Sequence, residues 1–272
     1  MKKITALLTL IALLSFVSDD GVLFKVQYKP ETKYSEILEQ SSHMTIKYHG
    51  DDAFIERLED KGIKNPTVTD KSSKTLAEFK TGKLTDGVHF PLSMEFISTT
   101  SSDGKKVIPD GTIIYGKSTI DSMPVLDSIS SPGMEDDMKQ VLLKTMGNLF
   151  TQITFPAKKL NVGDTFTHQL PVSIPIGGLT VKMNISTIYK LTKIDNGIAY
   201  FDITQVYNFT LDEFTTEGGG TGSGQVKYDI ANKFYCYYQE TSDMNMKMKM
   251  QGFSMDLNSK SSYTQTITFS KN

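Results

Sequence analysis

The amino-acid sequence predicts a mainly β protein of the α+β class, with one large curved antiparallel sheet or half-barrel and two amphipathic helices packed on or in its concave side. Apolar and polar residues alternate with a period of two along most of the chain, which is typical of strands with one buried face. Only two segments show helical spacing instead. If residues 234–251 form one strand, it spans about 55–60 Å, which is too long for a flat, compact sandwich; a bend at Glu240–Asp243 is the alternative.

Composition excludes several classes of protein. The 272 residues carry 29 Lys and Arg against 31 Asp and Glu, so the chain lacks the basic surface that a nucleic-acid-binding protein needs. One Cys cannot form an internal disulfide framework or a Cys-based metal site. With 38% hydrophobic residues, the chain is too apolar to be disordered and too polar to be a multispan membrane protein. No cofactor is expected.

Residues Met1–Ser18 have the pattern of a secretory signal peptide. Two lysines precede the apolar stretch Ile4–Val17, which is shorter than the ~20 residues of a membrane-spanning helix. A buried or membrane-anchoring helix is the alternative. We therefore expect a single β-rich domain over residues 19–272, periplasmic or secreted, with no stable transmembrane segment after cleavage. Because no Cys stands near residues 15–22, a lipid anchor of the bacterial lipoprotein type is excluded.

Alternating segments predict the strands of the first half of the chain. Their apolar residues are Val22, Phe24, Val26 and Tyr28; Met44, Ile46 and Tyr48; and Phe90, Leu92, Met94 and Phe96. A shorter strand is predicted at Gly111–Lys117.

Two helices interrupt this pattern. Asp51–Lys61 begins with acidic residues, has apolar residues on one side and stops before Gly62. The second is predicted from Pro132 to Phe150, where Ser131 can cap the helix and proline suits its first position. Both helices are amphipathic, so each should lie on a sheet or close a cavity.

The second half of the chain begins with the clearest hairpin. Residues 181–191 alternate up to Asp195-Asn196-Gly197, a two-residue turn signal, and the return strand carries Ala199, Phe201 and Ile203 on one face. A tight connection at residues 162–164 leads into a strand at Thr165–Leu170.

Glycine dominates the segment Glu217–Gly224, which we predict to be a flexible loop. A phosphate-binding loop is disfavoured, because no Gly-Lys-Ser/Thr follows and a strand rather than a helix comes next. The later strands are predicted at Gln225–Ile230, Lys233–Gln239, Asp243–Gln251 and Ser262–Phe269.

Four methionines occupy alternate positions of one predicted strand: Met244, Met246, Met248 and Met250. All four side chains should point to one face. That face is either part of a packed core or the wall of an adaptable hydrophobic cavity, because Met fills irregular spaces and suits varied apolar ligands. In the cavity interpretation, Met138 and Leu142 of the second helix line the same space. A copper(I) site is the third interpretation, since thioethers are soft ligands, although the run contains no His or Cys.

No catalytic residue or metal site is predicted. His43, His49, His89 and His168 form no His-x-His or His-x-x-x-His pair, and the chain contains no Gly-x-Ser-x-Gly. Cys236 stands between aromatic residues and is interpreted as a buried, inert thiol.

Low-specificity motifs carry a resemblance to a known group of proteins. Phe155-Pro156, Val162-Gly163-Asp164, Thr221-Gly222-Ser223-Gly224 and the Met-Lys-Met run resemble exported bacterial β-rich families of unknown function, usually described as uncharacterised secreted proteins or lipoproteins, over about residues 22–269. Such families have no established catalytic residues to carry over. The layout is also similar to lipoprotein-carrier (LolA/LolB-like) half-barrels, in which a curved sheet with helices encloses an apolar cavity.

These features together favour an exported, non-enzymatic envelope protein that binds an apolar small molecule, a lipid or a lipidated partner in a cavity of the curved sheet. The alternative is a structural or adhesion module with a solid core. A hydrolase with a non-standard site, built on His89 or His168 near an Asp, is the third hypothesis. The sequence does not identify a protein partner.

Overall fold

A computed structural model describes residues 21–106, 108–150, 155–176, 179–211, 215–250 and 252–272, so the predicted signal peptide lies outside the described residues. The helices are α2 (Asp52–Asp60) and α3 (Asp136–Phe150). The strands of the main sheet are β2 (Thr32–Gly50), β3 (Thr67–Thr81), β4 (His89–Ser101), β5 (Thr112–Thr119), β6 (Val125–Ser130), β8 (Thr165–Ile176), β9 (Leu179–Asp195), β10 (Ile198–Leu211), β11 (Thr215–Asp229), β12 (Phe234–Met250) and β13 (Phe253–Lys271). The two short strands β1 (Val22–Leu23) and β7 (Lys159–Leu160) form a separate pair.

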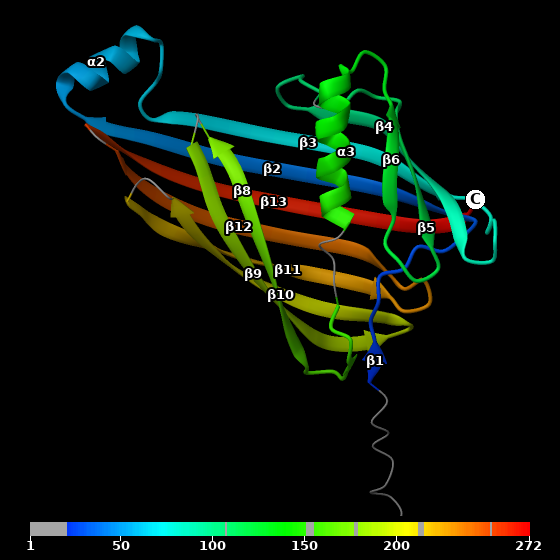
Figure 1. Ribbon diagram of the computed structural model, residues 1–272. Helices are drawn as coiled ribbons and strands as arrows, with labels where there is room; N and C mark the ends of the chain where they lie inside the picture. The colour runs from blue at the N-terminus through cyan, green and yellow to red at the C-terminus, as the bar shows by residue number, and fades with distance from the viewer. Residues whose placement is uncertain (1–20, 107, 151–154, 177–178, 212–214, 251) are drawn as a thin grey trace, which may run out of the picture.

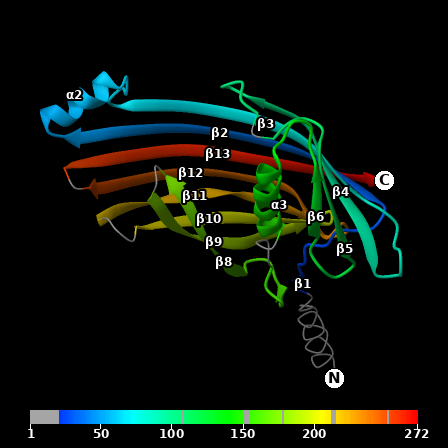
Figure 2. The ribbon, with the colours of Figure 1, turned by 45° about the horizontal axis from the view of Figure 1, so that its top comes forward.

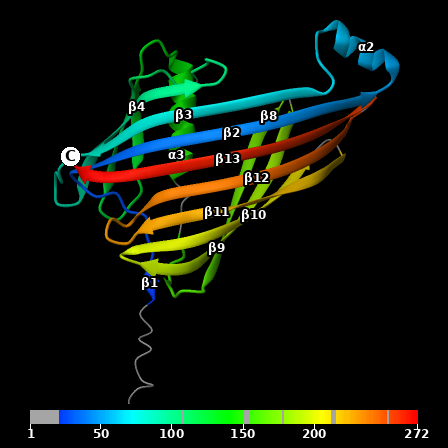
Figure 3. The same cartoon turned by 180° about the vertical axis from the view of Figure 1, so that it is seen from behind.

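The main sheet confirms the predicted fold class. Its strand order is β6-β5-β4-β3-β2-β13-β12-β11-β10-β9-β8, with antiparallel pairing at each step, and it is curved but not closed. Both edges of the sheet bend toward the same side, where α3 stands (Figure 1). The view from behind shows the long central strands without the helix in front of them (Figure 3), and the tilted view shows the arch of the sheet (Figure 2). Neither helix in the described ranges is both long and apolar enough to cross a membrane.

The long strands predicted near the end of the chain are continuous. β12 runs for 17 residues without the alternative bend at Glu240–Asp243, and β13 pairs with β2 along all 19 residues of both strands. The hairpin between β9 and β10 is also confirmed, because Asn196 and Gly197 both adopt positive φ angles between the paired residues Asp195 and Ile198.

The glycine-rich segment is not a loop, contrary to the prediction. Residues 215–229 form β11, which pairs with β10 on one side and β12 on the other. The glycines are needed because the neighbouring strand lies too close for a side chain. A Cβ atom at Gly224 would lie 1.9 Å from the carbonyl oxygen of Gln239, and one at Gly218 would lie 2.3 Å from that of Asn245. Glycine inside a strand therefore marks close approach of backbone here rather than flexibility.

One of the two helices has the predicted boundaries, and the other begins later than predicted. α2 has the expected boundaries, and the side chain of its N-cap residue Asp51 accepts a hydrogen bond from the backbone N–H of Phe54 at 2.8 Å. α3 begins at Asp136, four residues later than predicted. The predicted cap is used elsewhere: the Ser131 hydroxyl bonds to that of Thr112, and Gly133 has a φ of +71°, so the chain turns before the helix can start.

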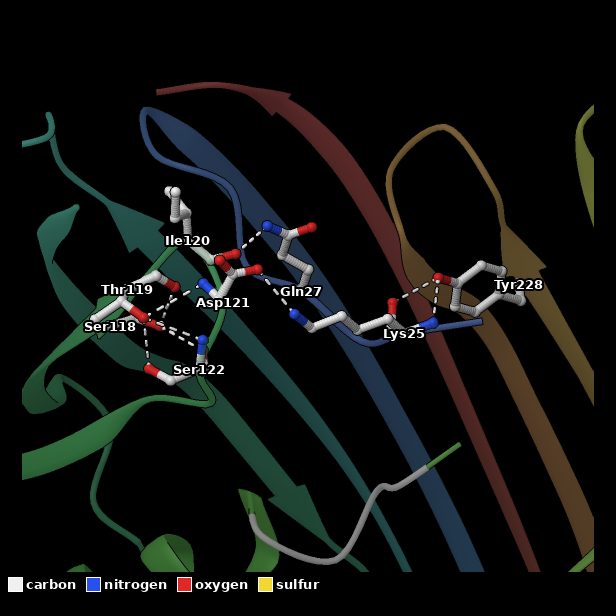
Figure 4. Close-up of polar contacts among 8 residues, drawn as sticks. All are labelled: Lys25, Gln27, Ser118, Thr119, Ile120, Asp121, Ser122 and Tyr228. Atoms are coloured by element: carbon white, nitrogen blue, oxygen red, sulfur yellow. Dashed lines mark hydrogen bonds and ion pairs between the residues drawn. The ribbon is translucent and has the colours of Figure 1, made fainter. Parts of the chain in front are cut away.

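The first segment of the described chain is also not the predicted strand. Beyond β1, residues 24–29 run without ladder pairing, yet Phe24, Val26 and Tyr28 are buried as their alternation predicts. This strap crosses one end of the sheet and joins its two halves (Figure 4). The hydroxyl of Tyr228 donates to the carbonyl oxygen of Lys25 at 2.6 Å, and the amide of Gln27 donates to the carbonyl oxygen of Ile120.

The strap lies between the two large core clusters. One cluster contains Val26 and Tyr28 and is covered by α3 through Leu142 and neighbouring apolar residues. The other contains Phe24, which packs edge-on against Phe201 and Tyr228 with ring centroids 5.1 Å apart in each case. The strap therefore completes both cores and closes this end of the sheet.

Candidate functional site

Strand register divides the sheet into an inner and an outer face. Because successive side chains of a strand point to opposite faces, the buried residues of each strand identify the inner one. On β12 the inner residues include Tyr238, Glu240, Ser242 and the four methionines at 244–250, all of the same parity. The inner face therefore changes character along this one strand, from aromatic and acidic to apolar.

A carboxylate lies in the middle of the inner face with tyrosines around it. The Tyr238 hydroxyl donates to Oε2 of Glu240 at 2.5 Å, and Tyr263 lies directly opposite Glu240 on β13, with its ring 5.7 Å from the ring of Tyr238. On the other side, Gly224 of β11 lies opposite Glu240 and presents no side chain. Tyr189 of β9 and Tyr207 of β10 complete what we call the tyrosine–glutamate cluster (Glu240, Tyr189, Tyr207, Tyr238 and Tyr263).

The electrostatics of this cluster follow from burial near a negative charge. Burial raises the pKa of Tyr189 and that of Tyr207 to about 12, and the nearby charge of Glu240 acts in the same direction. The pKa values of Tyr238 and Tyr263 are raised for the same first reason. All four phenols are therefore neutral at physiological pH and can donate hydrogen bonds.

A second carboxylate lies further along the inner face. Glu36 of β2 accepts a hydrogen bond from the side-chain amide of Gln265, which lowers the pKa of Glu36, but burial is the larger effect and raises it overall. Burial also raises the pKa of Tyr235, and the charge of Glu36 adds to that shift. The middle of the inner face is thus polar and titratable.

Uncharged hydrogen bonds connect this region to the next strands. The Tyr207 hydroxyl donates to Oε1 of Gln205 at 2.6 Å, and Nε2 of Gln205 donates to the Thr187 hydroxyl at 3.3 Å. Gln205 is 6% exposed, so these bonds satisfy a buried amide. Gly222 makes room for it, since a Cβ atom there would lie 2.6 Å from Oε1 of Gln205.

The predicted methionine stripe (Met244, Met246, Met248 and Met250) does share one face, the inner one. Met246 and Met248 are only 4% and 2% exposed, whereas Met244 and Met250 are half-buried. The two buried members form a cluster with Met255, against which these partly buried residues pack: Ile46, Tyr48, Phe209 and Leu257. Helix α2 adds to this end of the face, because Phe54 stacks on Phe253 with ring centroids 4.7 Å apart.

The two other predicted ligand-binding residues lie apart from this stripe. Leu142 packs against the core cluster around Tyr28, at the opposite end of the inner face, and Met138 is 54% exposed. The structure therefore groups the predicted residues into two sets and does not bring them together.

The outer face contains a hollow of about 950 Å³ that crosses the middle of the long strands. Hydroxyl side chains such as Ser41 and Ser262 dominate its lining, and their oxygen atoms lie 2.8 Å apart. Beside them, Nδ1 of His43 lies 2.7 Å from a carboxylate oxygen of Asp70. No hydrogen bond between described residues joins His43 to either serine, so these pairs do not form a catalytic relay.

The remaining histidines and the cysteine have surface or structural environments. His49 pairs with Asp256 at 3.1 Å and His89 with Asp86 at 2.6 Å, and all four side chains are partly exposed. The described residues contain no group of three or more His, Cys, Asp or Glu that could hold a metal ion. Burial raises the pKa of the Cys236 thiol, which opposes thiolate formation.

Sequence reasoning missed the tyrosine–glutamate cluster. The alternation of residues 181–191 includes Tyr189, but no sequence pattern points to Glu240 except as one end of the alternative bend at Glu240–Asp243. The cluster becomes visible only when the register between β12 and β13 places Tyr263 opposite Glu240.

Comparisons with known proteins do not place the chain in a family. No family model matches it, and no curated protein matches it. Among solved structures, a mutant of the Rh. blastica porin aligns with 9% identity and a TM-score of 0.24, over 85% of this chain and 100% of that one. OccK11 (OpdR) of Pseudomonas aeruginosa aligns with 7% identity and a TM-score of 0.23, over 91% and 100%. An outer membrane channel from Pseudomonas putida F1 aligns with 7% identity and a TM-score of 0.19, over 92% and 98%. Scores this low do not indicate a shared fold, so we infer nothing from these channels.

Proposed function

We propose that the protein is an exported, non-enzymatic binding protein that holds an amphipathic or apolar ligand along the inner face of its curved sheet. The observation that carries the proposal is the inner face of β12, which runs without interruption from Tyr238 and Glu240 to the methionine stripe. One face thus offers polar hydrogen-bonding groups next to flexible, polarisable apolar side chains. The signal-peptide pattern of Met1–Ser18 supports export to the periplasm or beyond.

The methionines allow this face to adapt to a ligand. Met has three rotatable bonds in its side chain and can repack around varied apolar groups, which is why it is common at promiscuous binding surfaces. Met244 leans over the backbone of β11, since a Cβ atom at Gly220 would lie 2.6 Å from Cγ of Met244. A rotation of Met244 away from Gly220 exposes bare backbone and widens the inner face.

A structural module with a solid core is the second candidate, and the burial of Met246 and Met248 favours it. The two candidates differ in whether apolar ligands bind at all. We would measure binding of N-phenyl-1-naphthylamine, a neutral fluorescent apolar probe, to the purified protein.

Matched charge substitutions locate the binding face. Met244→Glu places a carboxylate on the inner face, and Asn245→Glu places one on the outer face of the same strand. The binding proposal expects a fluorescence increase with the parent chain, loss of that increase in Met244→Glu, and no change in Asn245→Glu. A parent chain that leaves the probe dark, and that carries no lipid when isolated from a periplasm and analysed by native mass spectrometry, contradicts binding and favours the solid core.

A further inference from the structure

Glu240 is a negative charge on the inner face without a basic partner. Among the described residues, the ion pairs join neither Glu240 nor Glu36 to a lysine, arginine or histidine, whereas several outer-face carboxylates are paired, such as Asp243 with Lys260 at 3.5 Å and Glu39 with Lys74 at 2.9 Å. We propose that the ligand carries an ammonium group, which binds at the tyrosine–glutamate cluster while its apolar part lies along the methionine stripe. This inference rests on the proposed function.

The geometry of the cluster suits a cation. Tyr238 and Tyr263 meet edge to face at 81°, and the Tyr238 hydroxyl donates to Oε2 of Glu240, so two aromatic rings lie beside the carboxylate. The π-face of an aromatic ring carries negative potential, and cages of such rings recognise quaternary ammonium groups. Gly224 of β11, which lies opposite Glu240, contributes no side chain beside the carboxylate.

The same arrangement disfavours an anionic group. A carboxylate or phosphate of a ligand would face the charge of Glu240 and the negative faces of the rings. Burial is the main reason that the pKa values of Tyr189 and Tyr207 are raised to about 12, but the charge of Glu240 adds to both shifts and would oppose any further negative charge. A neutral polar group could accept hydrogen bonds from the phenols, but it would leave the charge of Glu240 uncompensated.

The distance to the methionines suits a lipid-like tail. Four residues of β12 separate Glu240 from Met244, which corresponds to about 13 Å of strand. One leaflet of a bilayer provides roughly 15 Å of hydrocarbon. A single acyl or alkyl chain can therefore extend from the cluster past Ser242 to Met244, the half-buried first member of the methionine stripe.

Calorimetry with ligands of equal tail length tests the proposal. Decyltrimethylammonium, decyl sulfate and decyl maltoside would be titrated below their micelle-forming concentrations, together with tetramethylammonium, which lacks a tail. We expect decyltrimethylammonium to bind about tenfold more tightly than the maltoside, and the sulfate to bind most weakly. Tetramethylammonium should bind far more weakly than its decyl derivative.

Two variants assign the preference to the cluster. Glu240→Gln removes the charge but keeps an oxygen that can accept from Tyr238, and it should abolish the preference for ammonium while leaving maltoside binding in place. Asp243→Asn, on the outer face of the same strand, should change neither the preference for ammonium nor the binding of the maltoside. Equal binding of the three decyl ligands, or a preference that survives Glu240→Gln, overturns the ammonium site and leaves the binding function standing. If no decyl ligand binds, the proposed function itself fails, and equal binding of tetramethylammonium overturns the role of the tail.

Discussion

Replacing Gly224 by alanine tests the explanation for the glycine-rich strand. An ideal Cβ atom at this position lies 1.9 Å from the carbonyl oxygen of Gln239 and 2.8 Å from Cα of Glu240. Carbon and oxygen in non-bonded contact stay about 3.3 Å apart, so β11 and β12 must separate locally by roughly 1.4 Å. Backbone atoms rather than a flexible side chain block the position, so rotation of a neighbouring side chain cannot relieve the contact.

The size of the effect follows from the ladder hydrogen bonds next to Gly224. A shift of that size carries an N–H···O contact beyond the range of a hydrogen bond. Loss of two or three such bonds at about 0.5–1.5 kcal/mol each lowers the free energy of unfolding by about 1–4.5 kcal/mol. For a chain of this length, that corresponds to a fall in Tm of about 2–18 °C.

Thermal unfolding followed by far-ultraviolet circular dichroism measures this effect, with Gly147→Ala as the matched control. Gly147 lies inside α3, and nothing lies within 4 Å of a Cβ atom there. Alanine in a helix interior is more favourable than glycine by about 0.5–1 kcal/mol, so the control should melt slightly higher than the parent chain. The same substitution thus has opposite signs at the two sites. A Gly224→Ala variant as stable as the parent would refute the close approach of β11 and β12.

Three further predictions concern the core, the strap and the inner carboxylate. Met248→Ala removes a side chain that is 2% exposed and should lower the free energy of unfolding in urea by about 2–5 kcal/mol; a change below 1 kcal/mol would show that this end is not packed. Tyr228→Phe removes the hydroxyl that bonds the partly buried backbone groups of Lys25, so it should lower the free energy of unfolding by about 0.5–1.5 kcal/mol and speed amide hydrogen exchange at residues 24–28; unchanged exchange there would contradict the role of the strap. Burial raises the pKa of Glu36, so the folded state binds its proton more tightly than the unfolded state, and the group destabilises the fold increasingly as the pH rises through that pKa. Glu36→Gln, which keeps an oxygen facing Gln265, should therefore match the parent at low pH and melt higher above neutrality, and equal melting at all pH values would argue against this burial.

Alternation was the most informative signal in the sequence. It placed Phe201 and Ile203 on the buried face of β10, and the Asn196-Gly197 turn fixed the register of β9 against β10. Alternation identifies a face but not a partner strand. The same signal therefore assigned residues 22–28 to a strand, although they form a strap that crosses the sheet and keeps only the burial pattern.

The position of the site could not be predicted because it depends on contacts between distant segments. Tyr263 and Glu240 are opposite each other only because β12 and β13 pair in the register that places Met250 opposite Phe253. Tyr189 comes from β9, three strands away from β12 in the sheet. Single-strand patterns predicted the apolar half of the inner face through its methionines but contained no information about which charges face one another.

The composition of β11 connects the fold to the proposed site. Between residues 218 and 224, every position that faces inward is a glycine: Gly218, Gly220, Gly222 and Gly224. Side chains of the flanking strands occupy the space above two of them, with Gln205 of β10 above Gly222 and Met244 of β12 above Gly220. At Gly220 and Gly222 the strand has no inner side chain because side chains of its neighbours lie where one would be, and at Gly218 and Gly224 the backbone of β12 lies there instead. A β-branched residue would have marked the segment as a strand, but its side chain would displace Gln205 from the polar region or Met244 from the methionine stripe. The feature that makes this segment look like a loop in the sequence is therefore the one that allows both halves of the inner face to form.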